Sequence, residues 1–193
     1  MTQGNPSPAA SVSVVYHSAE DRLLFVVTGA DNLKRAIMVT RRLTIRLIDG
    51  FAHLLDRTSS AAQEAPEWAR SDMIMFEHQG ALAKVQAPSA ASVTAPGAVT
   101  QKKPMSDTVA GAGSAAKTPP LPILMDAVDI KIKPKSFLLT LKSGGQAVSH
   151  MEVGRGDLHR FLALLRRKCD EADWRVVNQT KWLDLDAGSM TLN

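Results

Sequence analysis

The chain has 193 residues, a formal net charge of +4 at pH 7 and a hydrophobic fraction of 45%, which suits a globular protein. No hydrophobic run reaches the roughly 20 residues of a membrane-spanning helix, and the N-terminal residues do not resemble a secretory signal, so we expect neither membrane insertion nor export. The positive charge is spread along the chain, which is weaker than the clustered basic face of a dedicated nucleic-acid binder.

A first folded unit is expected over residues 11–85, after a disordered N-terminus at residues 1–10. Hydrophobic patterning predicts three short strands, over residues 11–17, 22–28 and 35–40. Apolar residues at three- and four-residue spacing then predict a helix over residues 41–57. The order of elements in this unit is therefore βββα.

An additional helix is predicted over residues 66–85, with Pro66 in its first turn. We assign Trp68, Met75 and Phe76 to its apolar side. This side is expected to pack on the sheet of the first unit. The alternative is a docking surface for a partner or a second copy, because flexible methionine-rich faces suit adaptable interfaces.

A long linker is predicted over residues 86–122, which consist mainly of Ala, Pro, Ser, Gly, Thr and Val without helical or strand periodicity. Such a segment cannot bury enough apolar area to offset the entropy of ordering it. We therefore expect it to be disordered and to act as a flexible tether.

A second unit, over residues 123–176, repeats the order of the first. Its three strands are predicted over residues 127–133, 137–142 and 148–153. Asp157 is expected to cap the helix that follows, which ends near Trp174. The sequence thus predicts an α+β fold of two antiparallel βββα units, a possible pseudo-repeat in which each helix covers a sheet.

The C-terminal tail, residues 177–193, places Trp182 in an acidic and hydrophobic stretch. One interpretation is a short linear docking motif. The other is a loose terminus that packs a single aromatic side chain.

No catalytic or metal-binding motif is recognisable, so we predict no enzyme activity, cofactor, metal or small-molecule ligand. Two helices could bring Asp49 and His53 together with Glu77 and His78 as a metal site or an acid–base pair. Solvated helix faces explain the same residues. Cys169 lies on the apolar stripe of the last helix and is interpreted as a core residue, and a lone cysteine favours a cytoplasmic location.

A glycine-containing turn, Gly154-Arg155-Gly156, joins the last predicted strand to the last helix. Backbone amides at such a helix start can bind an anion. Capping by Asp157 would already satisfy these amides, so capping is the preferred interpretation.

Two functions are predicted. The first is a non-catalytic protein-interaction or scaffold subunit of a larger intracellular complex, self-associating, because small units with Met- and Trp-rich helices leave apolar surface to cover. Its candidate contacts are Trp68, Met75, Phe76, Trp174 and Trp182. The alternative is nucleic-acid association through basic strand and helix faces. The candidate residues for this alternative are Lys131, Lys133, Lys135, Arg160, Arg166 and Arg167.

Overall fold

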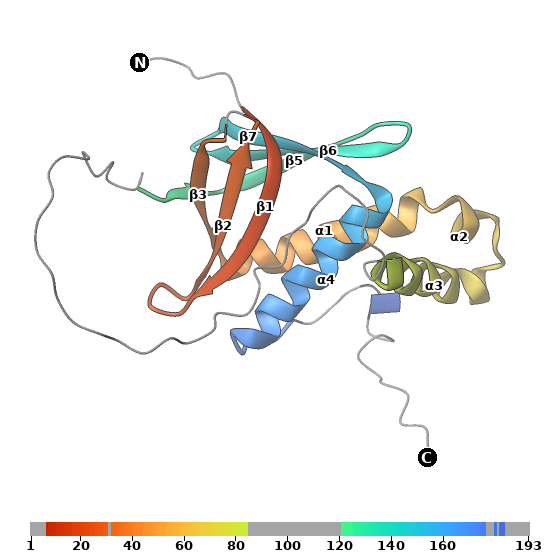
Figure 1. The fold of residues 1–193 in the computed structure, drawn as a ribbon. Coiled ribbons are helices and arrows are strands. Elements are labelled where there is room, and N and C mark those ends of the chain that lie inside the picture. Colours follow the sequence, from red (N-terminus) through yellow and green to blue (C-terminus); the bar gives the residue numbers. More distant parts are fainter. Residues whose placement is uncertain (1–6, 31, 85–120, 177–179, 181, 184–193) are drawn as a thin grey trace, which may run out of the picture.

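The computed structural model describes residues 7–30, 32–84, 121–176, 180 and 182–183 (Figure 1). The predicted linker, except Leu121 and Pro122, and most of the predicted C-terminal tail lie outside the described residues. The first strand begins at Ser7, so residues 7–10 are part of the sheet although they were predicted to be disordered. Parallel pairing of Ser7 and Pro8 with a strand of the second half accounts for this difference.

Within the described residues, seven strands form one mixed β-sheet in the order β4-β3-β2-β1-β7-β6-β5. The strands are β1 (Ser7–His17), β2 (Arg22–Gly29), β3 (Lys34–Thr40), β4 (Ile123–Met125), β5 (Ala127–Ile132), β6 (Ser136–Ser143) and β7 (Gln146–Gly154). Both predicted groups of three strands are antiparallel. They join through two parallel junctions, β1 with β7 and β3 with β4.

The sheet curves back on itself because its two edge strands are consecutive in the chain. Only Asp126 separates β4 from β5, and its backbone N–H donates to the carbonyl of Lys142 in β6 at 3.0 Å. The two halves therefore share one sheet. The α+β class is confirmed, and the pseudo-repeat stays a prediction because α2 and α3 follow only the first half.

The helices gather on one side of the sheet (Figure 1). They are α1 (Arg41–Thr58), α2 (Ser60–Glu64), the short 3₁₀ helix η1 (Glu67–Ala69), α3 (Arg70–Ala83) and α4 (Arg155–Glu171). Thr40 caps α1, since its hydroxyl accepts from the backbone N–H of Leu43. None of the described helices combines the length and apolar character needed to cross a membrane.

The hydrophobic core lies between the sheet and the pair formed by α1 and α4. Alternate residues of β2 and β6 point into it, as the period of a strand requires. Phe161 of α4 joins the two halves, because its ring lies 5.8 Å from that of Phe25 in β2 and 5.7 Å from that of Phe51 in α1. Cys169 is fully buried in this core, which confirms its interpretation as a core residue.

The start of α4 differs from the prediction. Strand β7 continues to Gly154 and α4 begins at Arg155, so Gly154 is the N-cap and Asp157 lies inside the first turn. No side chain caps this helix end; the carboxylate of Asp157 instead accepts from Arg160. The prediction that Asp157 caps the helix is therefore wrong.

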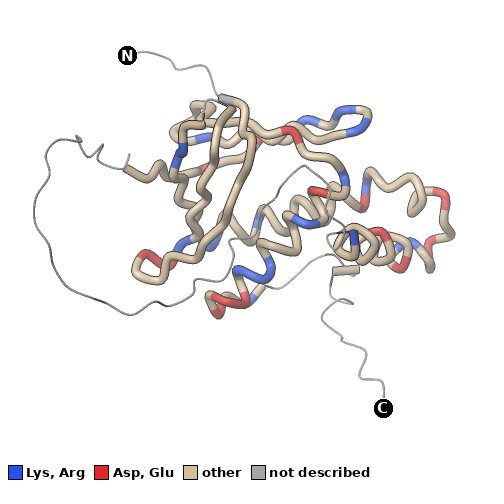
Figure 2. The backbone as a smooth tube through the Cα atoms, viewed as in Figure 1, with Lys and Arg blue, Asp and Glu red and all other residues tan. Residues whose placement is uncertain are grey.

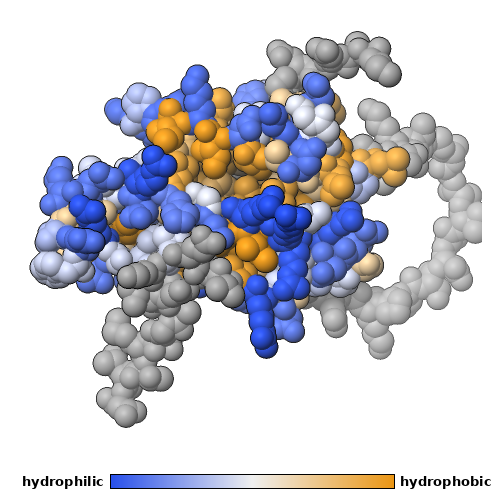
Figure 3. Space-filling model, turned by 180° about the vertical axis from the view of Figure 1, so that it is seen from behind, coloured by the Kyte–Doolittle hydropathy of each residue, from blue (hydrophilic) through white to orange (hydrophobic). Residues whose placement is uncertain are grey.

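The outer face of the sheet also carries apolar residues. Val15, Leu24, Met38 and Leu124 lie opposite one another across β1, β2, β3 and β4. Figure 3, which views the molecule from behind, shows hydrophobic residues gathered over the strands, whereas the end formed by α2 and α3 is mainly hydrophilic from that side.

Candidate functional site

Helix α3 packs against α4 through a side different from the predicted one. Its buried residues are Ile74, His78 and Ala81. Phe76, which was assigned to the packed side, is 73% exposed, and Trp68 in η1 is 81% exposed. Apolar spacing alone does not reveal this side, because a histidine is the middle residue of the series Ile74, His78 and Ala81.

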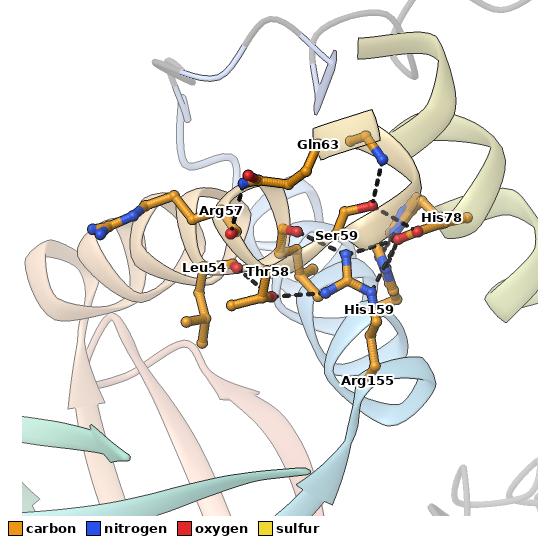
Figure 4. A network of polar contacts seen from close by, with 11 residues as sticks. Leu54, Arg57, Thr58, Ser59, Gln63, His78, Arg155 and His159 are labelled. Carbon is orange, nitrogen blue, oxygen red and sulfur yellow. Dashed lines mark hydrogen bonds and ion pairs between the residues drawn. The ribbon is translucent and has the colours of Figure 1, made fainter. Parts of the chain in front are cut away.

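Arg155, the first residue of α4, connects three helices (Figure 4). Its Nε and Nη2 donate to Oε2 of Glu77 in α3, at 3.0 and 2.7 Å. Nη1 donates to the hydroxyl of Thr58 at 2.7 Å, and Nη2 also donates to the carbonyl of Leu55 at 2.7 Å. The guanidinium thus lies at the C-terminus of α1, where the helix dipole favours a cation.

The second oxygen of Glu77 is held by Ser59. The Ser59 hydroxyl donates to Oε1 of Glu77 at 2.7 Å and accepts from the backbone N–H of Ala62, which caps α2. Partial burial opposes ionisation of Glu77, but the hydrogen bonds from Ser59 and Arg155 and the charge of Arg155 outweigh it. The pKa of Glu77 is therefore below its usual value, and the carboxylate is charged at neutral pH.

A buried histidine pair lies next to this ion pair. Nδ1 of His78 and Nδ1 of His159 are 3.1 Å apart, so one of the two atoms carries a hydrogen and donates a hydrogen bond that the other accepts. Both residues are 1% exposed, and the ring of Trp182 packs on them, 5.5 Å from His78 and 6.3 Å from His159. Burial, the neighbouring His78 and the charge of Arg155 lower the pKa of His159 to about 4.

Two buried nitrogens of this cluster, Nε2 of His159 and Nε1 of Trp182, have no hydrogen-bond partner among the described residues. The carboxylate of Glu77 is 3.7 Å from Nε2 of His159, which is beyond hydrogen-bonding distance. Leaving a buried polar group unpaired costs roughly 1–3 kcal/mol. The two unpaired nitrogens therefore lower the stability of the fold, and the packing of the His78, His159 and Trp182 rings against one another offsets part of this cost.

A groove of about 430 Å³, here called the α3–α4 groove, opens beside the cluster. Residues of α3 and its C-cap line one wall, and the first two turns of α4 line the other. The lining includes three cationic side chains, Lys84, Arg155 and Arg160, and one carboxylate, that of Glu77. A larger open concavity of about 880 Å³ lies between the end of α1, α2 and η1 and is lined in part by Trp68.

The other two predicted contact tryptophans are buried in the chain itself. Trp174 is 4% exposed, and its Nε1 donates to the carboxylate of Asp21 at 2.7 Å while its ring meets Tyr16 edge-on. Trp182 is 2% exposed. Neither ring offers much surface to a partner, whereas Trp68 and Phe76 do, and Met75 is partly buried.

The predicted basic residues do not form one row. Strand β5 ends at Ile132, so Lys133 and Lys135 lie in the turn to β6 and do not share a strand face with Lys131. Lys133 pairs with Glu152. In Figure 2 cationic residues mark this turn, whereas α4 carries both cationic and acidic residues.

Two of the predicted arginines are bound within the chain. Arg160 contacts Asp157 and donates to the carbonyl of Ala81 at 3.1 Å. Arg166 donates to the carbonyl of Leu183 at 3.0 Å. Arg167, the third, lies next to Arg166 on α4.

The structure does not assemble a metal centre from the residues it describes, because it contains no group of three or more His, Cys, Asp or Glu side chains placed to hold an ion. Glu77 and His78 meet Arg155 and His159 of α4, while Asp49 and His53 belong to α1. Burial raises the pKa of Cys169 to about 11, which leaves its thiol protonated and a poor nucleophile.

Comparison with family models, curated proteins and solved structures found no match for this chain. Its function is therefore argued from the geometry of α3, α4 and the groove between them.

Proposed function

We propose that this protein is a non-catalytic protein-binding subunit, whose partner is another protein chain that docks on the outward side of α3 and the adjoining α3–α4 groove. The observation that carries the proposal is that α3 has apolar residues on two sides. One side is buried against α4. The other places Met73, Phe76, Gly80 and Ala83 at three- and four-residue spacing, with Phe76 73% exposed.

Apolar residues on a second, exposed side of a helix leave a surface that a partner can cover. Spacing of this kind is what a helix uses to pack against another helix or in the groove of a partner. Phe76 can supply the large aromatic contact that often dominates the energy of an interface. The small residues Gly80 and Ala83 beside it leave room for side chains of the partner.

The polar network supports this role because it fixes α3 before any partner arrives. Arg155 and Ser59 hold Glu77 from α4 and from the start of α2, and His78 meets His159 behind it. A preformed surface loses less conformational entropy on binding than a mobile one. Nucleic-acid association has weaker support, since Lys133, Arg160 and Arg166 already contact groups within the chain.

Affinity purification of the tagged full chain from its native cells, after nuclease treatment, tests the proposal. Three versions are compared: the wild type, Phe76→Ala, and Ile132→Ala as a matched control, because Ile132 is an equally apolar side chain that is 58% exposed at the end of β5. Both substitutions remove exposed atoms and should change the free energy of unfolding by less than about 0.5 kcal/mol.

We expect the wild type and Ile132→Ala to retain the same proteins at fixed stoichiometry, and Phe76→Ala to lose them. Sedimentation velocity on the purified chains identifies the case in which the partner is a second copy, since the wild type would then sediment as an oligomer and Phe76→Ala as a monomer. Equal retention by all three versions, or recovery that nuclease abolishes, would contradict the proposal.

A further inference from the structure

We infer that the chain forms a two-fold symmetric dimer, in which the outward side of α3 packs against the same side of α3 from a second copy and the two helices run antiparallel. This inference rests on the proposed function and names its partner. Three observations carry it: the order of large and small residues along α3, a glycine that packing within the chain does not require, and the hollow beside that glycine.

The outward residues of α3 are arranged symmetrically about the level of residue 78. Met73 and Ala83 each lie five residues from this level, and Phe76 and Gly80 each lie two residues from it. In an antiparallel pair that crosses at this level, Met73 of one copy therefore faces Ala83 of the other, and Phe76 faces Gly80. Alternate spacing of three and four residues is the spacing that keeps two helices in contact along their length.

The sizes of these residues favour the antiparallel arrangement. The two large side chains, Met73 and Phe76, lie in the first half of the series, and the small residues Gly80 and Ala83 lie in the second. Antiparallel pairing places a large side chain opposite a small residue at every level, which is how facing helices interdigitate. Parallel pairing would place large against large and small against small. An interface between identical copies must be complementary to itself, and this side of α3 meets that requirement.

Gly80 is not explained by packing within the chain. It lies in the interior of α3, where glycine is less favourable than alanine. A methyl group added at this position would meet no atom of the described residues within 4 Å. A second helix gives the glycine a role, because the distance between two helix axes depends on the size of the residues at the contact.

The α3–α4 groove provides the space for the aromatic ring of the second copy. Gly80 and Ala81 line this groove, together with Phe76 of the same copy. Its volume of about 430 Å³ is larger than a phenyl ring, so a ring that faces Gly80 can enter it. Phe76 is 73% exposed in the single chain. The two-fold axis repeats the contact, so the dimer covers both exposed rings at once.

The charges at the two ends of the outward side are compatible with the same arrangement. Asp72 and Lys84 are both exposed, and each lies six residues from the level of residue 78. Antiparallel pairing brings Asp72 of one copy to the level of Lys84 of the other, so each end of the interface carries opposite charges. Parallel pairing would bring like charges to the same level, which disfavours association.

Sedimentation velocity of the full chain over a range of concentrations tests the inference. Five versions are compared: the wild type, Phe76→Ala, Gly80→Phe, the exchanged double variant Phe76→Gly with Gly80→Phe, and Gly50→Phe as a matched control. Gly50 is an exposed glycine of α1 that also has no atom of the described residues within 4 Å of an added methyl group. Circular dichroism of each version checks that the fold is retained.

We expect the wild type and Gly50→Phe to form the same dimer. The dissociation constant should rise about a hundredfold in Phe76→Ala, because one substitution removes a ring from both halves of the interface. Gly80→Phe should abolish the dimer, since two aromatic rings would then occupy one space. The exchanged double variant should recover the dimer, because a large side chain again faces a small residue at each level.

Distances between spin labels test the orientation without the exchanged variant. The labels are attached to cysteines introduced by Gln79→Cys or Lys84→Cys at exposed positions, while Cys169 is fully buried. In the antiparallel dimer the two Gln79 positions lie at nearly the same level. The two Lys84 positions lie about 18 Å apart along the helix axes, from a rise of 1.5 Å per residue. A parallel pair would bring both pairs of labels equally close.

A chain that stays monomeric at every concentration would overturn the inference, as would a dimer that Phe76→Ala leaves intact or labels that report a parallel pair. Affinity purification keeps these results separate from the proposed function, because it reports on Phe76 whether or not the chain self-associates. A monomer that still retains other proteins through Phe76 would keep the docking role of α3 with a different partner. A monomer whose retained proteins ignore Phe76 would contradict the inference and the proposed function together.

Discussion

At the scale of single residues, Arg155 links α4 to two other helices. It neutralises Glu77 in α3 and binds two groups at the end of α1, although it stands 78 residues beyond Glu77 in the chain. Its side chain is 28% exposed and that of Glu77 is 26% exposed, so the pair is only partly screened by water. Removal of one member of such a pair leaves the other without its counter-charge.

We predict that Arg155→Met lowers the free energy of unfolding by about 2 kcal/mol, because the carboxylate of Glu77 is left without a counter-charge. Methionine keeps most of the volume of the aliphatic part of arginine, so packing changes little. Urea denaturation followed by circular dichroism measures the loss. The double variant Arg155→Met with Glu77→Gln should recover part of it, since no buried charge remains. Equal losses in the single and double variants would show that the charge of Glu77 is not the cause.

The histidine pair predicts how stability depends on pH. The pKa of His159 is lowered from 6.5 to about 4 in the folded chain, so the unfolded chain binds a proton more readily than the folded one. The contribution of neutral His159 to the free energy of unfolding is therefore complete above pH 6.5, and it is lost as pH falls from about 6.5 towards 4. Glu77, whose pKa is lowered, adds a separate loss only below its unfolded value of 4.5.

Thermal melting between pH 7 and pH 4 checks this dependence. We expect the wild type to lose on the order of 2 kcal/mol over that interval from His159. The variant His159→Gln should start less stable at pH 7 and show a smaller decline across the same range. A decline of the same size in both versions would assign the pH dependence to other groups.

At the scale of elements, local patterns predicted most strands and helices but not how they associate. Alternation or a short apolar run was sufficient for β1, β2, β6 and β7, because either signal is visible in a few residues. Strand β4 has three residues, too few to show a period, and it is formed by pairing with β3. The mixed sheet could not be predicted, since its parallel junctions join segments far apart in the chain.

The candidate site shows the same limit. Trp68 and Phe76 were named as candidate contacts, although their side of the helix was expected to pack on the sheet, and the structure leaves both exposed. The pairing of Glu77 with Arg155 and of His78 with His159 was not predicted, because each pair joins α3 to α4 across about 80 residues of chain. A single histidine in a helix gives no signal that a second one will meet it.

The orientation of α3 can be tested by a matched pair of substitutions. Ile74 is fully buried against the molecule, while Met73, the preceding residue, is 37% exposed on the outward side. We predict that Ile74→Ala lowers the free energy of unfolding by about 2–4 kcal/mol through cavity formation, and that Met73→Ala changes it by less than about 1 kcal/mol. Guanidinium denaturation measures both, and a larger effect at Met73 would reverse the assignment of the two sides.

At the scale of the whole molecule, the two βββα halves pack around a common hydrophobic core. They share a sheet, β4 of the second half completes the edge of the first, and Phe161 of α4 fills the space between Phe25 and Phe51. Separating the halves would expose the apolar sides of β2, α1 and α4 to water. This exposure costs about 25 cal/mol of free energy per Å² of apolar surface.

We therefore predict that a fragment of residues 1–84 and a fragment of residues 121–193 are each unfolded alone and fold when mixed. Far-UV circular dichroism should show little ordered structure in either fragment and native-like structure in the mixture. Trp174 adds a second probe, because its ring is buried against Tyr16 of the other fragment. A fragment of residues 1–84 that melts cooperatively near the temperature of the full chain would show that the first half is an independent domain. Complementation instead would show that the sheet closes only when β1 pairs with β7 and β3 pairs with β4. Because both pairings join the two halves, the complete sheet could not be predicted from the sequence of either half.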